Sequence, residues 1–168
     1  MHSWRTLILP FVEFKPIYKE YHFDEPWNGP HNRELAVLKL SLFQCPETKH
    51  ADSETNYLVV VGPKTVFPGS KCVRISEIMG GTTQTILLVE VEHSGIQWSE
   101  PRDLSYAEAI RGINPKDGIG ILSHHKGDGA QITFADGSVR FLSSNFPADN
   151  LPALLDRETE KKPPIPPN

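Results

Sequence analysis

The sequence is poor in cysteine and has no long apolar run. Its 168 residues include two cysteines, two methionines and three tryptophans. Neither cysteine stands in a C-x-x-C pair, which argues against a zinc ribbon or a thioredoxin-type site. Because no run of 18 apolar residues occurs, we expect no membrane span. Residues 1–5 also lack the start of a signal peptide, which is a basic region followed by an apolar one.

Charge and helix-breaking residues restrict the class further. The net charge is −4, and lysine and arginine form no basic stripe, so nucleic-acid binding is not expected. The 15 prolines and 12 glycines, with 38% hydrophobic and 23% charged residues, are typical of a globular protein with many loops. We therefore predict one domain over residues 1–156. The composition excludes a coiled coil, a collagen-like chain and a fully disordered chain.

The N-terminal part predicts short helices. Apolar residues among the first 22 follow the spacing of an amphipathic helix, but Pro10 and Pro16 each remove a backbone donor, so we expect two or three short pieces. A further helix is predicted over residues 30–42, capped by Asn28 or Gly29. Its predicted buried stripe consists of Leu35, Leu38, Leu42 and Phe43.

The remainder of the chain predicts strands. Residues 57–61 form a short β-branched run, and residues 84–93 are the longest strand candidate. A short helix is expected over residues 105–111. Residues 157–168 are charged and then proline-rich, so we predict a tail that is disordered or extended. Together these elements predict an α+β fold, with short N-terminal helices packed on an antiparallel sheet.

The clearest local signal is a β-hairpin over residues 130–142. Asp136 and Gly137 stand between two alternating runs, and Asp-Gly is typical of a two-residue type I′ turn. That turn fixes which residues face each other, and the apolar pairs must share the buried face. The predicted pairs are Phe134 with Val139 and Ile132 with Phe141 on the buried face, and Thr133 with Arg140 on the other.

Histidine and carboxylates near this hairpin are the first candidate site. They could bind a ligand or an ion such as Ca²⁺ or Zn²⁺, or carry out acid–base chemistry. In the alternative, structural interpretation the turn itself requires Asp136, His125 hydrogen bonds the following glycine-rich loop, and Glu90 is solvated on a sheet face. Both interpretations stay open. The candidate residues are Glu90, His125, Asp128 and Asp136, with His124 beside them.

A second group of polar residues lies around Trp27. Two histidines and two carboxylates within ten residues resemble the metal loop of a metal-dependent hydrolase, but they lack the spacing of the H-E-x-x-H pattern. In the alternative interpretation the carboxylates accept hydrogen bonds from loop amides, and Trp27 anchors the loop. The four residues are His22, Asp24, Glu25 and His31.

Other catalytic and nucleotide-binding patterns are missing. The sequence has no G-x-S-x-G elbow, no G-x-x-x-x-G-K-[ST] loop and no G-x-G-x-x-G. We therefore expect neither enzymatic activity nor a cofactor. Trp4, Trp27 and Trp98 are expected to clamp loops onto the core, or one of them lines a binding patch. Cys45 and Cys72 are either two buried thiols of a reducing compartment or one disulfide worth roughly 3–4 kcal/mol.

Two blocks of the sequence are specific in combination: Asp24-Glu25-Pro26-Trp27 and Asp136-Gly137-Ser138-Val139-Arg140-Phe141, with Trp98-Ser99-Glu100-Pro101 between them. In this order they resemble a bacterial family of unknown function that is expanded in planctomycetes. That family carries the prepilin-type processing-associated domain, in which nine residues separate a histidine from Asp-Gly. The resemblance covers roughly residues 3–156.

The resemblance implies a pilin-like head with an α+β fold and no catalytic residues. Its members typically begin with a prepilin leader and a long apolar helix, and they look like pseudopilin-like proteins of the cell envelope. Protein partners in the envelope are therefore expected, with the oligomeric state left open. This sequence begins after the expected leader and helix, so a cytoplasmic location also stays open. Ten residues instead of nine separate His125 from Asp136.

Overall fold

The computed structural model describes residues 1–47, 53–123 and 125–166. No helix in this part of the chain is long and apolar enough to cross a membrane.

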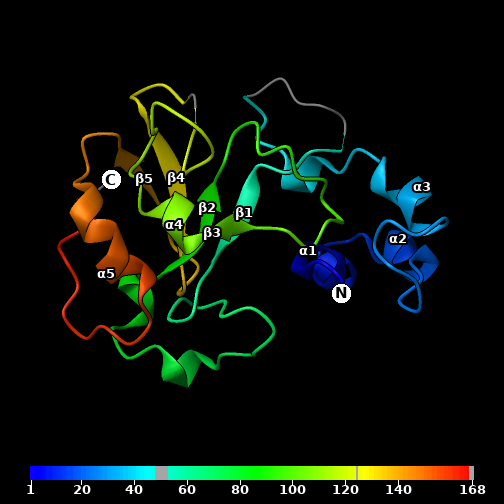
Figure 1. The fold of residues 1–168 in the computed structure, drawn as a ribbon, viewed down its shortest axis with the longest axis horizontal. Coiled ribbons are helices and arrows are strands. Elements are labelled where there is room, and N and C mark those ends of the chain that lie inside the picture. Colours follow the sequence, from blue (N-terminus) through cyan, green and yellow to red (C-terminus); the bar gives the residue numbers. More distant parts are fainter. Residues whose placement is uncertain (48–52, 124, 167–168) are drawn as a thin grey trace. The chain divides into compact units, whose positions relative to one another are not determined.

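The chain divides into two compact units. Unit 1 comprises residues 1–56 and 93–102, and unit 2 comprises residues 57–92 and 103–168. Figure 1 labels the helices and strands of both. Unit 1 contains the N-terminal helices, and unit 2 contains the β-sheet.

Unit 1 begins with three short helical pieces, which confirms the prediction that the prolines divide this region. They are α1 (Trp4–Ile8), the 3₁₀ helix η1 (Leu9–Phe11) and α2 (Lys15–Glu20). Pro10 and Pro16 both lie in a first turn, where the missing N–H costs nothing. The Ser3 hydroxyl caps α1 by accepting a hydrogen bond of 3.2 Å from the amide of Arg5.

The next helix of unit 1 is shorter than predicted, so the expected helix over residues 30–42 is wrong. The chain forms α3 (Asn32–Ala36) and the 3₁₀ helix η2 (Ser41–Phe43), and neither Asn28 nor Gly29 caps α3. Leu40 has extended backbone angles between the two helices (φ −107°, ψ 98°), which ends the helical spacing. The buried residues are therefore Ala36, Leu40 and Phe43, whereas Leu38 and Leu42 are exposed.

Trp98 brings the two parts of unit 1 together. Its side chain is 1% exposed and packs with Leu9, Leu40 and Phe43 in one apolar cluster. The indole Nε1 donates a hydrogen bond of 3.1 Å to the carbonyl of Leu38. Trp4 and Trp27, the other two tryptophans of unit 1, are half-buried.

Arg5 joins α1 to the same segment of unit 1. Its side chain is fully buried, and its guanidinium donates hydrogen bonds to backbone carbonyls of residues 98–102. Nε reaches the carbonyl of Trp98 at 3.0 Å, and Nη2 reaches those of Glu100 and Arg102 at 2.9 Å each. Arg5 therefore ties α1 to residues 98–102 within unit 1.

Unit 2 is a five-stranded mixed sheet, and the α+β class is confirmed. The strands lie side by side in the order β3-β1-β2-β4-β5; β1 and β3 are parallel and the other neighbours antiparallel. Two helices, α4 (Tyr106–Ala109) and α5 (Leu151–Leu155), contact the sheet. The strands are β1 (Tyr57–Val61), β2 (Ile86–Glu90), β3 (Leu104–Ser105), β4 (Gly129–Phe134) and β5 (Val139–Ser143), and the 3₁₀ helices are η3 (Ile75–Glu77), η4 (Thr82–Gln84) and η5 (Ala148–Asn150).

The β4–β5 hairpin forms where predicted, but its predicted register is wrong by one residue. In the turn after Phe134, Gly137 has a positive φ of 86°, while Asp136 does not. This is a three-residue loop with a glycine bulge rather than a type I′ turn, and the bulge takes up one extra residue. The observed pairs are Thr133 with Val139, Ile132 with Arg140, Gln131 with Phe141 and Ala130 with Leu142.

The shifted register changes which hairpin residues are buried. Leu142 is fully buried, while Val139 is 50% exposed, so the expected core position of Val139 is wrong. Arg140 lies on the same face as Phe134, and its guanidinium covers the Phe134 ring at 5.3 Å from the ring centre. A one-residue shift moves every side chain of a strand to the opposite face.

The chain after α5 has no regular secondary structure over residues 157–166, yet its backbone is hydrogen-bonded to unit 2. The amide of Arg157 donates to the carbonyl of Lys64 at 2.9 Å, and the amide of Met79 donates to the carbonyl of Arg157 at 2.8 Å. The predicted boundaries, one domain over residues 1–156 and a tail over 157–168, stay a prediction. Residues 167 and 168 lie outside the described part of the chain.

Candidate functional site

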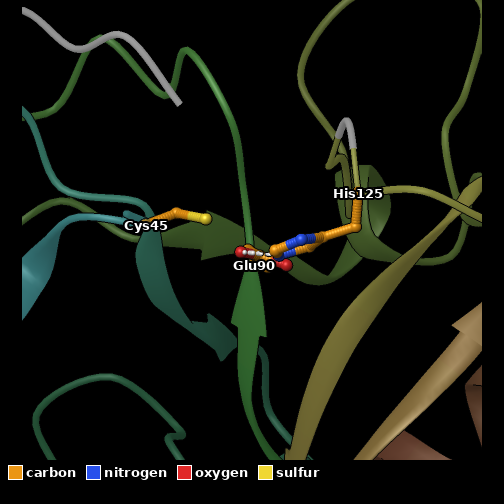
Figure 2. A group of neighbouring side chains, drawn as sticks. All are labelled: Cys45, Glu90 and His125. Carbon is orange, nitrogen blue, oxygen red and sulfur yellow. Dashed lines mark hydrogen bonds and ion pairs between the residues drawn. The ribbon is translucent and has the colours of Figure 1, made fainter. Parts of the chain in front are cut away.

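Two of the predicted site residues of unit 2 meet directly. The imidazole Nε2 of His125 lies 2.9 Å from the Glu90 carboxylate oxygen Oε1 (Figure 2). A carboxylate oxygen only accepts, so Nε2 carries the proton of this hydrogen bond. The side chain of Glu90 is 2% exposed and that of His125 is 18% exposed. The Glu90 carboxylate is therefore buried, and the prediction of a solvated Glu90 is wrong.

The end of strand β2 explains why a carboxylate is buried here. The pairing of β2 with β4 ends at Val89 opposite Ile132. One residue further on, the Glu90 oxygen Oε2 accepts a hydrogen bond of 3.1 Å from the amide of Gln131, and the Glu90 carbonyl accepts one of 3.0 Å from the amide of Leu122. Beyond the last β2–β4 pair, the Glu90 side chain thus supplies the acceptor for the Gln131 amide that a backbone carbonyl would supply in a continuing strand pair.

Two glycines shape the loop that carries His125. Gly127 has a positive φ of 106°, which favours glycine. A Cβ on Gly129 would lie 2.2 Å from the carbonyl oxygen of Leu142 and 2.6 Å from the ring of Phe141, so no larger residue fits without a backbone shift. At the start of the loop the Ser123 hydroxyl accepts from the amide of His125 at 3.3 Å. The loop backbone therefore fixes the position of the His125 Cα, from which the imidazole extends.

Asp128, the third predicted candidate, is engaged elsewhere. One of its carboxylate oxygens accepts from the Asn114 amide Nδ2 at 2.8 Å, and the other accepts from the Ser144 hydroxyl at 2.5 Å. The Ser144 hydrogen bond, followed by that of Asn114, lowers the pKa of Asp128 below its usual value. Asp128 thus ties the His125 loop to two other segments of unit 2.

Asp136, the fourth candidate, serves the hairpin turn. Its carboxylate accepts from the Ser138 hydroxyl at 2.7 Å and from the Ser138 amide at 2.9 Å. The same two hydrogen bonds lower the pKa of Asp136. Asp136 therefore stabilises the hairpin loop across Gly137, which matches the structural interpretation of this residue. The fifth residue of the group, His124, lies outside the described residues.

Four polar residues that surround the site were not predicted: Asn114, Ser123, Gln131 and Ser144. Ser123 accepts from the amide of His125 and, through its own amide, donates to the Asn114 side chain at 3.0 Å. Asn114 has a positive φ of 52°, a conformation in which asparagine is enriched. The pair Asn114-Pro115 was the available signal, because this dipeptide favours a turn. Nothing in the sequence distinguishes the two serines from others.

The second predicted group, around Trp27 in unit 1, holds a loop together. The Glu25 carboxylate accepts from the amide of Asn32 at 2.5 Å, and the Asn32 side chain bonds the backbone of His22 in both directions. The rings of His22 and His31 are stacked with centroids 3.8 Å apart, and His31 reaches the carbonyl of Glu20 at 2.7 Å.

The other residues of this loop also contact its own backbone or lie in solvent. Asp24 is exposed, and the carbonyl of Pro26 accepts hydrogen bonds from the amide of Gly29 and the side chain of Asn32. The contacts match the loop-anchoring interpretation better than a shared metal ion.

The two cysteines differ in environment. Cys45 is buried in unit 1, where its amide donates to the Asn56 side chain at 2.9 Å, and Cys72 is exposed in unit 2. Within the described residues neither forms a disulfide. Both alternatives for the two cysteines stay predictions, but the expectation that both thiols are buried is wrong for Cys72.

The chemistry that the His125–Glu90 pair can perform is limited by its partners. Both carboxylate oxygens of Glu90 already accept hydrogen bonds, one from His125 and one from the backbone of Gln131. An imidazole and a carboxylate are ligands that Zn²⁺ accepts, and the same pair can hold or release a proton. A cavity of 170 Å³ in unit 2 is lined by Pro63, Lys64, Tyr106 and Asp156, so it does not include the pair.

The chain matches a known protein family. The sequence profile of a family described as "Protein of unknown function (DUF1559)" matches residues 1–68 and 92–149, well over half of the chain. The match leaves out Glu90 and the rest of β2, while it includes His125 and the hairpin. No curated protein and no solved structure matches the chain.

Proposed function

The chain belongs to the family of proteins of unknown function DUF1559, and from this premise we propose that it is a non-enzymatic structural or interaction domain of the cell envelope. The finer assignment, a pseudopilin-like protein with the prepilin-type His–Asp–Gly domain, belongs to the same proposal and rests on the sequence blocks around Trp27, Trp98 and Asp136. Its expected partners are other proteins of the envelope.

One observation carries the proposal: the polar residues that could have formed an active site bind the protein's own backbone and loops. Glu90 accepts from the amide of Gln131, Asp136 from that of Ser138, and Glu25 from that of Asn32. A catalytic set instead converges on a pocket where a reacting atom can lie about 3 Å from several of its members. Side chains used as hydrogen-bond acceptors for loops favour a structural role.

The absence of enzymatic activity is tested on the purified full chain. We expect no turnover of a panel of generic esters, phosphoesters and glycosides, measured with and without added Zn²⁺ and Mg²⁺. Turnover that disappears in His125→Ala would overturn the non-enzymatic assignment. Turnover that survives this change but elutes with the protein through a second purification step would overturn the assignment as well, whereas turnover that separates from the protein indicates a contaminant.

The envelope location is tested in the source cells. Fractionation followed by immunoblotting is expected to place the protein with the envelope or the periplasm. An in-frame prepilin leader in the genomic DNA before codon 1 would support the pseudopilin-like assignment. Recovery of the protein from the cytosol alone would contradict the location and leave the fold assignment unaffected.

A second candidate function, ligand or metal binding, is favoured by the 2.9 Å contact between His125 and the buried Glu90. Zn²⁺ suits this pair better than Ca²⁺, because Ca²⁺ prefers ligand sets made of oxygen atoms. Metal analysis of protein purified without chelator tests it. A stoichiometric ion that is lost in Glu90→Gln supports binding, and an unchanged melting temperature with Zn²⁺ and with EDTA counts against it.

A further inference from the structure

A pocket in unit 2 lies apart from the residues of the candidate site, and the proposed function gives it no role. Its volume is 170 Å³, and it is lined by Pro63, Lys64, Tyr106 and Asp156. An engineered protein cavity of about 150 Å³ binds benzene, so this pocket has room for one ring-sized group. Apolar walls with a few polar groups are typical of sites for small ligands. Here the rings of Pro63 and Tyr106 are the apolar part.

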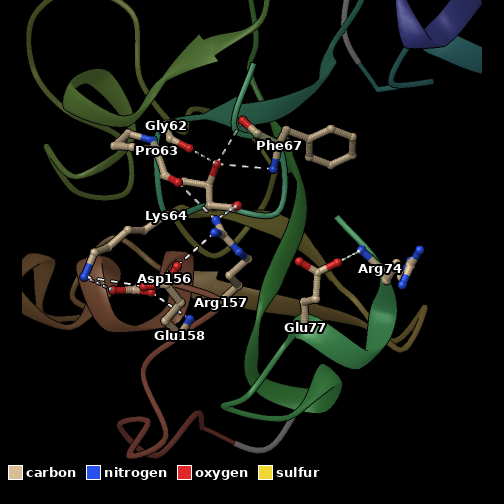
Figure 3. Close-up of polar contacts among 10 residues, drawn as sticks. Gly62, Pro63, Lys64, Phe67, Arg74, Glu77, Asp156, Arg157 and Glu158 are labelled. Atoms are coloured by element: carbon tan, nitrogen blue, oxygen red, sulfur yellow. Dashed lines mark hydrogen bonds and ion pairs between the residues drawn. The ribbon is translucent and has the colours of Figure 1, made fainter. Parts of the chain in front are cut away.

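The loop of residues 62–67, which forms one side of the pocket, is held by hydrogen bonds to its backbone. The Thr65 hydroxyl is buried and donates to the carbonyl of Val60 at 2.8 Å. The Arg157 guanidinium donates to the carbonyls of Pro63 at 3.1 Å and Thr65 at 2.9 Å (Figure 3). The pocket is therefore formed before a ligand arrives, which lowers the entropy cost of binding.

Tyr106 and Asp156 are held in place as well. Tyr106 is the first residue of α4, which the Ser105 side chain caps. A Cβ on Gly62 would lie only 2.9 Å from the Cβ of Tyr106, so the glycine lets the tyrosine pack against the loop. Asp156 follows α5, and its Oδ1 accepts a hydrogen bond of 2.7 Å from the amide of Glu158. The second carboxylate oxygen, Oδ2, is the one that approaches Lys64.

The two charged residues of the pocket form only a loose ion pair. The Lys64 ammonium lies 4.0 Å from Asp156 Oδ2 and 3.7 Å from Glu158 Oε2, and Figure 3 shows the three side chains together. Both distances are longer than a hydrogen bond, and the Lys64 side chain is 64% exposed. Such an exposed pair contributes little to stability, so a ligand can replace it at low cost.

The balance of charge decides which ligand suits the pocket. An anion bound at Lys64 would lie close to two carboxylates, and a cation bound at Asp156 would lie close to the ammonium of Lys64. Like charges brought together in this way oppose binding. A zwitterion avoids both conflicts, because each of its charges meets the opposite charge of the protein. An α-amino acid carries its ammonium and carboxylate on one carbon, so its two charges are close together, as those of Lys64 and Asp156 are.

We propose that this pocket binds a free α-amino acid whose side chain carries one ring, such as phenylalanine. The ring lies between Pro63 and Tyr106, the α-carboxylate pairs with Lys64, and the α-ammonium pairs with Asp156 Oδ2. A peptide has only one of these two charges at each end, so a free amino acid fits better than the end of a partner protein. The proposal does not depend on the proposed function, since the pocket shares no residue with the His125–Glu90 pair.

The test is an NMR titration of the isotope-labelled full chain with L-phenylalanine. Saturable shifts of the Lys64 and Tyr106 amides are expected, with a dissociation constant of about 1 mM or lower. Two matched probes each lack one charge: 3-phenylpropionate has no ammonium, and 2-phenylethylamine has no carboxylate. Each should bind at least about fivefold more weakly. L-Alanine has no ring and should bind at least about tenfold more weakly, because the apolar walls stay uncovered.

Variants assign each charge to its partner. Lys64→Gln should weaken binding of L-phenylalanine about fivefold without weakening that of 2-phenylethylamine, which has no carboxylate for Lys64. Asp156→Asn should weaken binding of L-phenylalanine about fivefold without weakening that of 3-phenylpropionate. The matched control is Lys116→Gln, an exposed lysine of unit 2, which should change binding by less than about twofold. Circular dichroism melting curves verify that each variant is folded.

Three results would overturn the proposal. The first is the absence of saturable shifts with L-phenylalanine up to about 10 mM. The second is binding that Lys64→Gln and Asp156→Asn leave unchanged, or shifts confined to residues away from the pocket, because the ligand would then lie elsewhere. The third is a probe with a single charge that binds the wild-type chain as tightly as L-phenylalanine does. The pocket would then select a ring with one charge and not an amino acid.

Discussion

Units 1 and 2 bury an ionisable side chain in different ways. In unit 1 the Arg5 guanidinium binds three backbone carbonyls of one segment. In unit 2 the Glu90 carboxylate binds one backbone amide and the imidazole of His125. The partners of Arg5 are backbone groups of one segment, whereas Glu90 is bonded to a side chain, which another residue or a ligand could replace. A buried charge stabilises a fold only when such partners satisfy it.

The two units also differ in what holds the backbone. Among the described residues of unit 1, the only strand-like pairing is the isolated bridge between Glu54 and Gln97, and side chains such as Arg5, Asn32 and Trp98 provide many of the long-range hydrogen bonds. Unit 2 has ladders between five strands. Truncating one buried polar side chain should therefore lower the free energy of unfolding of unit 1 more than that of unit 2. Unit 2 should be more sensitive to changes that disturb its backbone geometry.

The largest effect is expected for Arg5→Met. This change removes the Arg5 donor from the carbonyls of Trp98, Glu100 and Arg102 and should lower the free energy of unfolding of unit 1 by about 3–5 kcal/mol. All three tryptophans lie in unit 1, so urea unfolding followed by tryptophan fluorescence reports this unit. The matched control is Arg33→Met, an exposed arginine of α3, which should stay within about 0.5 kcal/mol. Equal effects of the two variants would contradict the comparison.

The next effect concerns the backbone of unit 2. Gly129→Ala places a Cβ against the carbonyl of Leu142 and should cost about 2–3 kcal/mol. The control Gly137→Ala meets no atom within 4 Å and should cost only about 1 kcal/mol, for its positive φ. Hydrogen exchange of residues 129–143 and thermal melting measure both. A larger loss for Gly137→Ala would mean that the turn, not the close approach at Gly129, limits the hairpin.

A smaller effect is expected at the Glu90–His125 pair. Glu90→Gln keeps one acceptor and should cost about 1–2 kcal/mol, and His125→Gln about 1 kcal/mol. The double variant should cost less than the two together, by a coupling of about 0.5–1.5 kcal/mol, because the residues share one hydrogen bond. Urea unfolding followed by circular dichroism measures the cycle, with the exposed Glu160→Gln as control. Strict additivity would show that the 2.9 Å contact contributes nothing.

The fold could be predicted where local chemistry decides it. The prolines divided the N-terminal helices, and Asp136-Gly137 located the hairpin. The hairpin register could not be predicted, because Asp-Gly fits both a two-residue turn and a three-residue loop with a glycine bulge. The length of the helix after residue 30 also depends on tertiary contacts, since the Leu38 carbonyl binds Trp98, 60 positions away.

The candidate site could be predicted only in part, for a similar reason. Glu90 and His125 were both named, but their contact joins residues 35 positions apart and depends on where β2 leaves β4. Asp128 and Asp136 looked equivalent to them in the sequence. Their roles differ because Ser144 and Ser138 supply hydroxyl groups that only the folded chain brings close.

The smallest predicted effect is that low pH and high pH destabilise different units. Hydrogen bonds from Ser144 and Ser138 lower the pKa values of Asp128 and Asp136 in unit 2 below the usual 3.8. These carboxylates therefore stabilise unit 2 above about pH 3.8, and this contribution is lost as the pH falls through their lower folded pKa values. In unit 1, burial and then the Glu25 carboxylate raise the pKa of Tyr21 above 10.0, so its contribution is present below pH 10 and is lost as the pH rises through the folded value.

The expected outcome is that acid weakens unit 2 first and alkali weakens unit 1 first. Asp128→Asn should flatten the decrease in melting temperature below about pH 4, and Tyr21→Phe should flatten the decrease above about pH 10. Tryptophan fluorescence follows unit 1, and hydrogen exchange of residues 129–143 follows unit 2. Loss of the tryptophan signal in acid before the hairpin exchanges would contradict the comparison. It would mean that in acid the hydrogen bonds around Arg5 stabilise unit 1 less than the strand pairing stabilises unit 2. This would hold although Asp128 and Asp136 of unit 2 are then protonated.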